Sequence, residues 1–289
     1  MTMAASYAGN LEGRYLRCGG HRLDLDRPRV MGIVNVTPDS FSDGGRFFDP
    51  ARALDRARQL MADGADIVDI GGESTRPGAH PVSEADELAR VLPLIETLAG
   101  EGALVSIDTT KPSVMRAAIA AGAAVVNDVR ALEEPGALEA VAQSHTAVCL
   151  MHMQGAPRTM QREPHYDDVV REVRDFLLAR AHACEAAGIA HDRIAIDPGF
   201  GFGKTVDHNL QLLRALPTMV HTGYPVVAGL SRKSTIGRLT GREVDDRMAG
   251  SVSAALAAVA RGAAIVRVHD VKETVDAIKV WLAVEGKTP

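Results

Sequence analysis

Hydrophobic residues along this chain gather in short runs, which alternate with longer segments where apolar and polar residues mix at helical spacing. Each run is nearly continuous in apolar residues, which is typical of a strand buried on both faces of a parallel sheet. Eight such runs are present: 29–36 (RVMGIVNV), 65–72 (ADIVDIGG), 103–109 (ALVSIDT), 123–129 (AAVVNDV), 146–153 (TAVCLMHM), 193–199 (RIAIDPG), 224–231 (YPVVAGLS) and 263–270 (AAIVRVHD).

The segments between the runs are rich in alanine and leucine and predict amphipathic helices. Their expected positions are near 50–63, 83–99, 112–121, 135–143, 167–187, 207–216, 245–261 and 271–283. Ser83, Pro112 and Asp207 are typical of helix starts. Several segments end in a dipeptide with glycine just before the next run, and glycine suits the left-handed residue that follows a helix. These dipeptides are at 63–64, 121–122, 187–188 and 261–262.

Eight strand–helix units in about 260 residues match the number and length of a (β/α)8 barrel, which is the α/β fold that we predict. A doubly wound open sheet is the weaker alternative, because no break divides the eight units. Before the first run, residues 15–28 predict a hairpin that turns at Gly19-Gly20 and lies against the lower end of the barrel. We expect residues 1–13 to be flexible and residues 14–285 to form one domain.

Composition narrows the class of protein. The chain has 289 residues, 46% of them hydrophobic and 24% charged, as in a globular protein. A net charge of −5 argues against a nucleic-acid surface. Three widely spaced cysteines, Cys18, Cys149 and Cys184, suit a reducing compartment. Neither a signal peptide nor an apolar stretch of membrane-spanning length is visible, so we expect a cytoplasmic protein that does not bind a membrane.

One stretch, 197–205 (DPGFGFGKT), follows an apolar run and ends in Gly-Lys-Thr, as a nucleotide-binding P-loop does. The P-loop pattern requires glycine where this chain has Pro198, and proline has no N–H to offer a phosphate. The dinucleotide-binding spacing also fails, because Lys204 stands where its third glycine belongs. The glycines of this stretch therefore need another explanation.

Polar residues stand at the carboxyl end of every run, where (β/α)8 barrels carry their active sites. They are Asn35, Glu73, Ser74, Thr75, Arg76, Asp108, Asn127, Asp128, His152, Asp197, Ser231, Arg232, Lys233, Ser234, Arg267 and His269. For each, an ordinary helix cap is the alternative. Asp108 escapes it because Thr109 or Thr110 is better placed to cap, and Asp197 because a glycine loop follows it. Inside a barrel, Arg267 is tolerable only with an anionic partner.

Two loops at the same end are long and polar, at 35–49 (NVTPDSFSDGGRFFD) and 73–81 (ESTRPGAHP). We expect them to close over a ligand; ordinary surface loops are the alternative, as a turn is for Asn35 taken alone. Carboxylates and an amide on neighbouring strands suit a flat heterocycle with N–H donors, such as an aminopyrimidinone. The nearby cations suit phosphate. These residues predict a site for a ring with a phosphate tail and do not name the reaction.

With its motifs taken in order, the chain from about residue 14 onward closely resembles the dihydropteroate synthase family of folate enzymes, which sulfonamides inhibit. The motifs are MGIVNVTPDSFSDGG (31–45), DIGGESTRPGA (69–79), SIDTTKP (106–112), VVNDV (125–129), CLMHMQGAP (149–157), DPGFGFGKT (197–205), GLSRKS (229–234) and RVHDV (267–271). Their order and spacing along one barrel make the resemblance specific, although no single motif would.

The resemblance implies a role for each of these residues. Those expected to bind a pterin are Asp108, Asn127, Met151, Asp197, Phe202, Gly229 and Lys233. Those expected to bind diphosphate are Asn35, Thr75, Arg76, Arg267 and His269, with Asn35 also a ligand of the cofactor Mg²⁺. The aminobenzoate side is expected to comprise Phe41, Thr75, Pro77 and Ser234. Asp108, Lys233 and Arg76 are the expected catalytic residues. Lys204 and Thr205 are expected to be incidental, or to lead into a helix.

The resemblance also implies a reaction, the joining of 7,8-dihydropterin-6-ylmethyl diphosphate to 4-aminobenzoate with release of diphosphate, and it suggests a homodimer. The alternatives are a pterin-binding methyltransferase barrel and a non-catalytic pterin-binding homologue. The two long loops hold few large apolar residues and should be mobile when no ligand is bound. We therefore expect 4-aminobenzoate to bind only after diphosphate and Mg²⁺.

Overall fold

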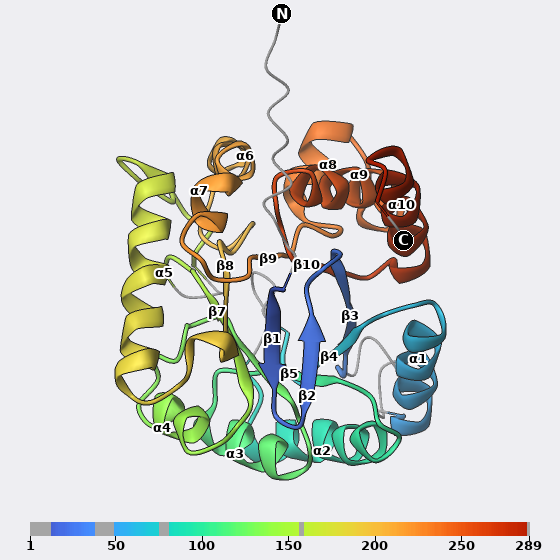
Figure 1. Ribbon diagram of the computed structural model, residues 1–289, viewed down its shortest axis with the longest axis vertical. Coiled ribbons are helices and arrows are strands. Elements are labelled where there is room, and N and C mark those ends of the chain that lie inside the picture. The colour runs from blue at the N-terminus through green and yellow to red at the C-terminus, as the bar shows by residue number, and fades with distance from the viewer. Residues whose placement is uncertain (1–12, 38–48, 75–80, 156–158, 288–289) are drawn as a thin grey trace, which may run out of the picture.

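The centre of the protein is a closed ring of parallel strands (Figure 1). The computed structural model describes residues 13–37, 49–74, 81–155 and 159–287. The ring strands are β3 (Arg29–Asn35), β4 (Ile67–Gly71), β5 (Val105–Asp108), β6 (Val125–Asp128), β7 (Ala147–Met151), β8 (Ile194–Asp197), β9 (Val227–Ala228) and β10 (Ile265–Val268). They pair in the order β8-β7-β6-β5-β4-β3-β10-β9, and a bridge from Ile196 to Val226 joins the two ends. The predicted (β/α)8 barrel is confirmed.

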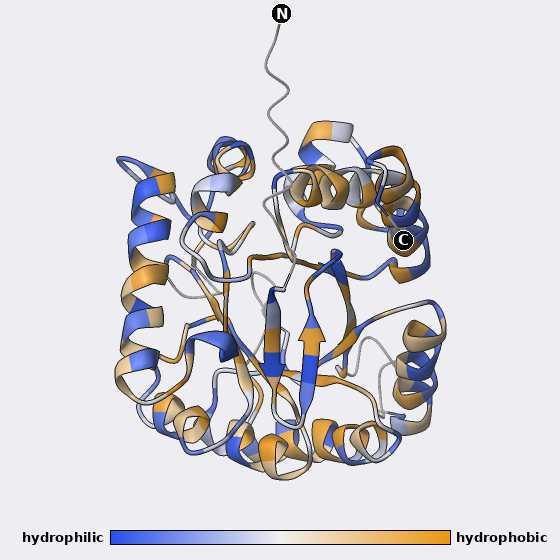
Figure 2. Cartoon of the chain, viewed as in Figure 1, coloured by the Kyte–Doolittle hydropathy of each residue, from blue (hydrophilic) through white to orange (hydrophobic). Residues whose placement is uncertain are grey.

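Helices surround the strands on the outside of the ring (Figure 1). The described α-helices are α1 (Pro50–Ala62), α2 (Glu84–Gly100), α3 (Pro112–Ala120), α4 (Ala137–Ala142), α5 (Val169–Ala186), α6 (Val206–Arg214), α7 (Leu216–Val220), α8 (Ser234–Thr240), α9 (Met248–Val259) and α10 (Val271–Val284). Two short 3-10 helices are η1 (His191–Arg193) and η2 (Val244–Asp246). Figure 2 shows hydrophobic residues along the strands and on the helix faces turned toward them.

The elements differ from the sequence prediction mainly between residues 207 and 240. The predicted helix 207–216 is two helices, because a new helix begins beside Pro217. The predicted strand 224–231 shrinks to the two residues of β9, and α8 follows where the sequence predicted no helix.

Helix starts agree with the sequence prediction in part. Ser83 caps α2 as predicted. Thr205, rather than Asp207, caps α6 through a capping box. Lys111 occupies the N-cap position of α3 without a side-chain cap, so neither of the expected threonines caps that helix.

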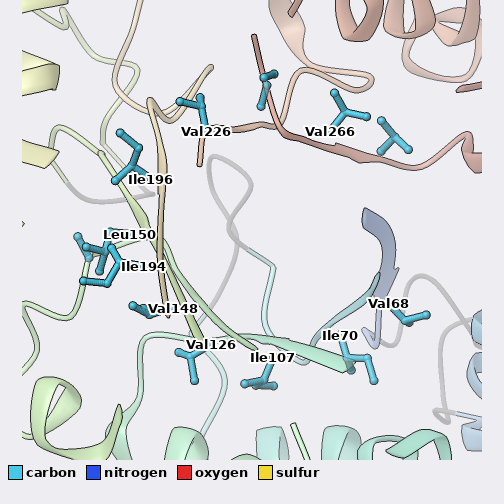
Figure 3. Packing of buried hydrophobic residues seen from close by; sticks show 14 of the residues in the cluster. Val68, Ile70, Ile107, Val126, Val148, Leu150, Ile194, Ile196, Val226 and Val266 are labelled. Atoms are coloured by element: carbon cyan, nitrogen blue, oxygen red, sulfur yellow. The ribbon is translucent and has the colours of Figure 1, made fainter. Parts of the chain in front are cut away.

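Alternate residues of each strand face opposite sides, and the outward side chains form the main core. Figure 3 shows outward residues such as Val68, Ile107 and Leu150 pointing from the strands toward the helices. Inward residues near the strand starts, such as Ile67 and Val125, form a separate buried layer inside the ring. Further along the same strands the inward residues are polar. The inside of the ring is therefore apolar at the lower end, where the strands begin, and polar at the carboxyl end of the strands.

A two-stranded hairpin closes the lower end of the ring. Its strands β1 (Tyr15–Cys18) and β2 (His21–Asp24) pair antiparallel, and Gly19 takes the left-handed conformation that the turn requires. Leu16, Cys18, Leu23 and Leu25 are buried in the same cluster as the inward residues of the strand starts. The predicted hairpin and its predicted place are confirmed.

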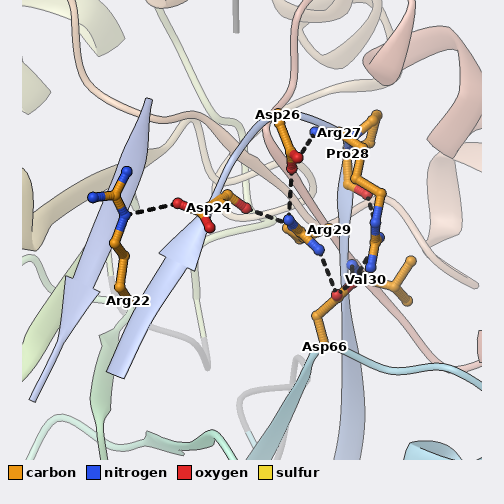
Figure 4. Close-up of polar contacts among 8 residues, drawn as sticks. All are labelled: Arg22, Asp24, Asp26, Arg27, Pro28, Arg29, Val30 and Asp66. Carbon is orange, nitrogen blue, oxygen red and sulfur yellow. Dashed lines mark hydrogen bonds and ion pairs between the residues drawn. The ribbon is translucent and has the colours of Figure 1, made fainter. Parts of the chain in front are cut away.

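A small ionic network fixes the exit from the hairpin, as Figure 4 shows. Arg29 donates to the Asp24 carbonyl at 2.5 Å, to Asp26 at 2.7 Å and to Asp66 at 3.1 Å. Arg27 also donates to Asp66, at 2.7 Å. The segment after β2 is thereby tied to the start of β3 and to the residue just before β4.

The structure bears only in part on two expectations, the flexible N-terminal segment and the single domain. The flexible segment 1–13 lies outside the described residues except for Gly13, and the assignment of 14–285 to one domain stays a prediction. Within the described ranges, no helix is both long and apolar enough to cross a membrane.

Candidate active site

Parallel pairing places the polar residues of neighbouring strands at one level of the barrel. Asn35 pairs in register with Gly71, Gly71 pairs with Asp108, and Asp108 pairs with Asn127. Further around the ring, Met151 at the end of β7 pairs with Asp197 at the end of β8. The carboxyl end of the ring therefore gathers these residues, as the sequence predicted.

A buried aspartate that the sequence analysis did not single out joins three of these strands. Asp69 Oδ2 accepts a hydrogen bond from Arg267 Nε at 2.6 Å and one from Asn127 Nδ2 at 3.2 Å. Arg267 Nη2 donates to Asp108 Oδ2 at 2.7 Å. Two carboxylates thus neutralise the inward guanidinium, which confirms that Arg267 needed an anionic partner. Asp69 is 0% exposed, and its place two residues before Gly71 was the signal that its side chain points inward.

The contact with Asp69 also decides how Asn127 is turned. An ionised carboxylate can only accept hydrogen bonds, so it faces the amide nitrogen of Asn127. The amide oxygen of Asn127 is then directed elsewhere, as a further acceptor beside Asp108. The buried amide and two carboxylates, from Asp108 and Asp197, give this end of the barrel the acceptors that a ring with several N–H donors requires.

Asp197 and Lys233 approach each other across a glycine. A Cβ on Gly229 would lie 3.7 Å from Asp197 Oδ2, 3.8 Å from Lys233 Nζ and 3.9 Å from Arg267 Cβ. The missing side chain therefore leaves room between three charged residues. Lys233 Nζ donates to the Phe200 carbonyl and lies 4.6 Å from the centre of the Phe202 ring. Phe202 is thus brought beside the charged cluster from the loop after β8.

Burial favours the uncharged forms of Asp108, Asp197 and Lys233 in this cluster. It raises the pKa of Asp108 to about 7, although the charge of Arg267 opposes this. It also raises the pKa of Asp197, against the charge of Lys233 and the N–H of Gly199. Burial lowers the pKa of Lys233 to about 8, and Asp197 opposes that shift. Shifts of this kind cluster at functional sites.

Other predicted rim residues have local partners. His269 Nδ1 lies 3.0 Å from Ser231 Oγ. Arg232 forms an ion pair with Asp270 at 2.5 Å, and the grouping of Arg232 with the phosphate-binding cations stays a prediction. Ser234 is exposed at the first position of α8.

Two further rim positions serve the fold. Asp128 accepts the N–H groups of Arg130 and Leu132, at 2.9 and 2.7 Å, as a helix cap or turn residue does. Glu73 forms an ion pair with Lys111, which also contacts the buried Glu87.

Four of the residues expected at the site lie outside the described residues: Phe41, Thr75, Arg76 and Pro77.

The expectation that Lys204 is incidental is wrong, whereas the alternative of a helix approach is confirmed for Thr205. Lys204 is 2% exposed, and its Nζ contacts His152 and two carbonyls of its own loop. Thr205 caps α6. Lysine at the end of a glycine loop suggested a phosphate ligand or a chance residue, and nothing in the local sequence indicated that it would be buried.

Comparison with known proteins agrees with this geometry. Residues 31–269 match the family model described as "Pterin binding enzyme". The chain is 56% identical over 272 residues to the dihydropteroate synthase of Neisseria meningitidis serogroup C, which covers 92% of this chain and 96% of that protein. The chain belongs to the dihydropteroate synthase family. It is therefore a transferase of folate biosynthesis, which forms 7,8-dihydropteroate and diphosphate from a dihydropterin diphosphate and 4-aminobenzoate.

Solved dihydropteroate synthases share the fold throughout. The enzyme of Xanthomonas albilineans, solved with 4-aminobenzoic acid, is 57% identical with a TM-score of 0.89, and the match covers 94% of this chain and 98% of that chain. The enzyme of Burkholderia cenocepacia, solved in complex with 7,8-dihydropteroate, is 53% identical with a TM-score of 0.87, covering 94% and 97%. Membership of this family displaces the methyltransferase alternative.

Proposed function

We propose that Asp108, Asn127 and Asp197 bind the pterin of this reaction through its ring N–H groups and amino group. The observation that carries this proposal is the meeting of their acceptor oxygens at one end of the barrel, together with the contact that turns Asn127. Lys233 then meets the far edge of the ring, and Met151 and Phe202 line its faces. Gly229 keeps the space free that a flat ring would enter.

The diphosphate is assigned to Arg267 and His269. Arg267 has five N–H donors, and its bonds to Asp69 and Asp108 use two of them, so donors remain for an anionic ligand. Ser231 and His269 contact each other at the neighbouring strand end, which holds the imidazole beside β10. Both residues lie where a leaving group attached to the pterin would reach.

Asn35 is the proposed protein ligand of Mg²⁺. Its amide lies at the carboxyl end of β3, and the described residues include no cluster of three histidine, cysteine or carboxylate side chains suited to a metal. A single protein oxygen fits Mg²⁺, which often keeps water and substrate phosphate oxygens as its other ligands. When bound, the cation supplies positive charge that stabilises the departing diphosphate.

The chemistry that these residues support is a substitution at the exocyclic methylene of the pterin. The bond from this carbon to the diphosphate oxygen breaks, and a bond to the amine nitrogen of 4-aminobenzoate forms as that nitrogen loses a proton. Arg267 and His269 stabilise the leaving charge. Asp108 provides a negative charge near the ring, which favours a cationic pterin as the carbon–oxygen bond lengthens.

The second substrate is assigned to residues of the two long loops and to α8. Phe41, Thr75 and Pro77 are the proposed contacts of 4-aminobenzoate, with Thr75 and Arg76 also near the diphosphate and Ser234 on α8. Ser234 is exposed at the start of that helix, where a small ligand can reach its hydroxyl. The binding order expected from the sequence, diphosphate and Mg²⁺ before 4-aminobenzoate, is part of this proposal.

A homodimer and a cytoplasmic location complete the proposal. Large exposed hydrophobic residues occur on neighbouring elements around α9, which packs against both α8 and α10 (Figure 1). They are Leu239, Val244, Met248, Val280 and Val284. Exposed hydrophobic side chains on adjoining elements support association with a second copy. The three cysteines are buried and free, which suits a reducing compartment.

The test of the function is release of diphosphate by the purified chain. We expect release only when the pterin diphosphate, 4-aminobenzoate and Mg²⁺ are all present. A non-catalytic homologue would bind pterin and release no diphosphate, so this outcome would contradict the proposal.

Asp197→Asn tests the pterin assignment directly. The substitution replaces an acceptor oxygen with an NH₂ group that faces a ring donor, and such a mismatch costs about 1–3 kcal/mol. We expect the Kd of a bare pterin, measured by calorimetry, to rise at least about fivefold. Asp276→Asn on the exposed face of α10 is the matched control and should leave the Kd unchanged. Pterin affinity close to that of the wild type in Asp197→Asn would refute the assignment.

A further inference from the structure

The buried amino group of Lys204 is enclosed by acceptors from two loops. Lys204 Nζ lies 2.9 Å from the Gly199 carbonyl and 3.0 Å from the Phe202 carbonyl, both in its own loop after β8. It also lies 2.9 Å from His152 Nδ1 and 3.3 Å from the His152 carbonyl, at the end of β7. The Lys204 side chain therefore joins two strand ends that border the pterin site.

The chemistry of these partners fits a charged ammonium group. Carbonyl oxygens can only accept, and Nδ1 of a neutral imidazole accepts when the ring proton is on Nε2. Burial, followed by the nearby charge of Lys204, lowers the pKa of His152 to about 3, so the ring is neutral at neutral pH. Three N–H groups of an ammonium then match the three shortest contacts. Burial lowers the pKa of Lys204 well below its ordinary value, and the charge of Asp197 opposes this shift.

The loop after β8 curls around this amino group. Gly199, Gly201 and Gly203 all have positive φ, which allows the loop to bend tightly. The Gly199 and Phe202 carbonyls accept from Lys204, and the Phe200 carbonyl accepts from Lys233. The same curl places the ring of Phe202 beside Lys233.

His152, the partner of Lys204 at the end of β7, is fixed by packing and by a backbone hydrogen bond. His152 is 7% exposed, and its ring packs edge-on against Phe176 with 5.0 Å between ring centres. Its backbone N–H donates to the Asp197 carbonyl at 3.0 Å. A Cβ on Gly199 would lie 1.9 Å from the His152 carbonyl, which shows how closely the two loops approach. His152 follows Met151 directly, so the position of the loop and that of Met151 are linked.

We propose that Lys204 is a positioning residue for the pterin, which ties the loop after β8 to the end of β7 so that Asp197, Met151 and Phe202 keep their places. The inference rests on the proposed pterin site. It assigns the Gly-Lys-Thr sequence a purpose that is neither nucleotide binding nor chance. Lys204 itself lies behind the loop and acts through the residues that meet the ligand.

The experiment compares Lys204→Met with the wild type in three measurements: the Kd of a bare pterin, the Michaelis constant for the aminobenzoate substrate, and the circular dichroism of the unliganded chain. Methionine keeps most of the length of the side chain and removes its donors. We expect the pterin Kd to rise at least about tenfold, because two loop carbonyls lose their partner. At saturating pterin diphosphate, the aminobenzoate Michaelis constant should stay within about twofold of the wild-type value, because that site lies on other loops. Lys279→Met, on the exposed face of α10, should change none of these values.

His152→Gln provides a milder variant in case Lys204→Met does not fold. It removes the Nδ1 contact and keeps the backbone carbonyl contact, so the pterin Kd should rise by a smaller factor while the aminobenzoate Michaelis constant does not change. If both variants fold, their effects on pterin binding should not add, because they break one connection.

The outcomes separate this inference from the proposed function. Wild-type chain that neither binds pterin nor releases diphosphate would contradict both. Wild-type chain that does both, with an unchanged pterin Kd in a folded Lys204→Met variant, would overturn the positioning role alone. Equal losses for pterin and 4-aminobenzoate would also overturn it, because they would show a general effect on the fold. If only His152→Gln folds, the same two results in that variant decide against the proposal.

Discussion

Charged residues inside the barrel form a hydrogen-bonded network instead of isolated ion pairs. Arg267 bridges Asp69 and Asp108, and Asp69 also holds Asn127. Arg267 therefore supports the barrel wall as well as facing the proposed diphosphate. Removal of this one cation would leave two adjacent carboxylates without a cationic partner.

Arg267→Ala should consequently affect both stability and binding. We expect a loss of about 3 kcal/mol in the free energy of unfolding, near the lower end of the cost of leaving buried charge unpaired, because Arg267 keeps some exposure. Urea denaturation measures this loss. Affinity for the pterin diphosphate should fall further than affinity for a bare pterin. Unchanged stability would show that the contacts with Asp69 and Asp108 contribute nothing.

The shifted carboxyl and amino groups predict a pH dependence of pterin binding. Protonated Asp108 would present a donor to a ring donor, and its pKa is raised to about 7 by burial. Affinity for a bare pterin should therefore weaken as the pH falls through neutrality. Lys233, with its pKa lowered to about 8, loses its charge as the pH rises, so affinity should weaken there as well. Calorimetry of a bare pterin across this range avoids the titration of a diphosphate; constant affinity from pH 5 to pH 9 (roughly two units below the pKa of Asp108 and one unit above that of Lys233) would contradict the prediction.

At the scale of elements, the loop after β8 depends on glycine at one position above all. Gly199 has φ of +69°, and a Cβ there would lie 1.9 Å from the His152 carbonyl. Gly199→Ala should therefore lower the free energy of unfolding by more than about 2 kcal/mol and weaken pterin binding. Gly100→Ala, at the end of α2 with no heavy atom within 4 Å of the added Cβ, is the control and should leave the free energy of unfolding unchanged or raise it by up to about 1 kcal/mol. Equal denaturation midpoints for the two variants would rule out the crowding.

Most elements were predictable because their signals are local. Seven of the eight expected strands rest on continuous apolar runs that remain in the sheet, whereas 224–231 leaves it soon after the two residues of β9. The seven-residue helix α8 was not predicted because it is short and contains Gly237. The site was predictable where polar residues end a strand. Asp69 was missed because it lies within an apolar run, and Lys204 because its burial depends on His152, 52 residues away.

At the scale of the whole molecule, the barrel has two different ends. The hairpin and the inward apolar layer close the lower end, whereas the inward polar residues gather at the other. Ligand binding at the carboxyl end can therefore vary with little effect on the packing below it. Between these ends, the wall of the barrel is uneven: β9 pairs with β10 over two residues and meets β8 through the single bridge from Ile196 to Val226.

This thin contact between β8 and β9 predicts where the barrel opens first. Amides at 226–229 should exchange with solvent faster than those of β5, which pairs with β4 on one side and β6 on the other. A bound pterin should slow exchange at 226–229 more than in β5, and hydrogen-exchange mass spectrometry measures both. Equal protection of the two segments would contradict this.

Because β9 is short, we expect a bound substrate to stabilise this part of the barrel wall. Asp197 ends β8, while Gly229 and Lys233 follow β9, so a ring held by both sides spans the place where backbone hydrogen bonds are fewest. In the proposed binding mode, the ligand would supply contacts where the two strands share a single backbone bridge. We therefore expect the wall between β8 and β9 to gain contacts when the substrate binds and to lose them when the product leaves.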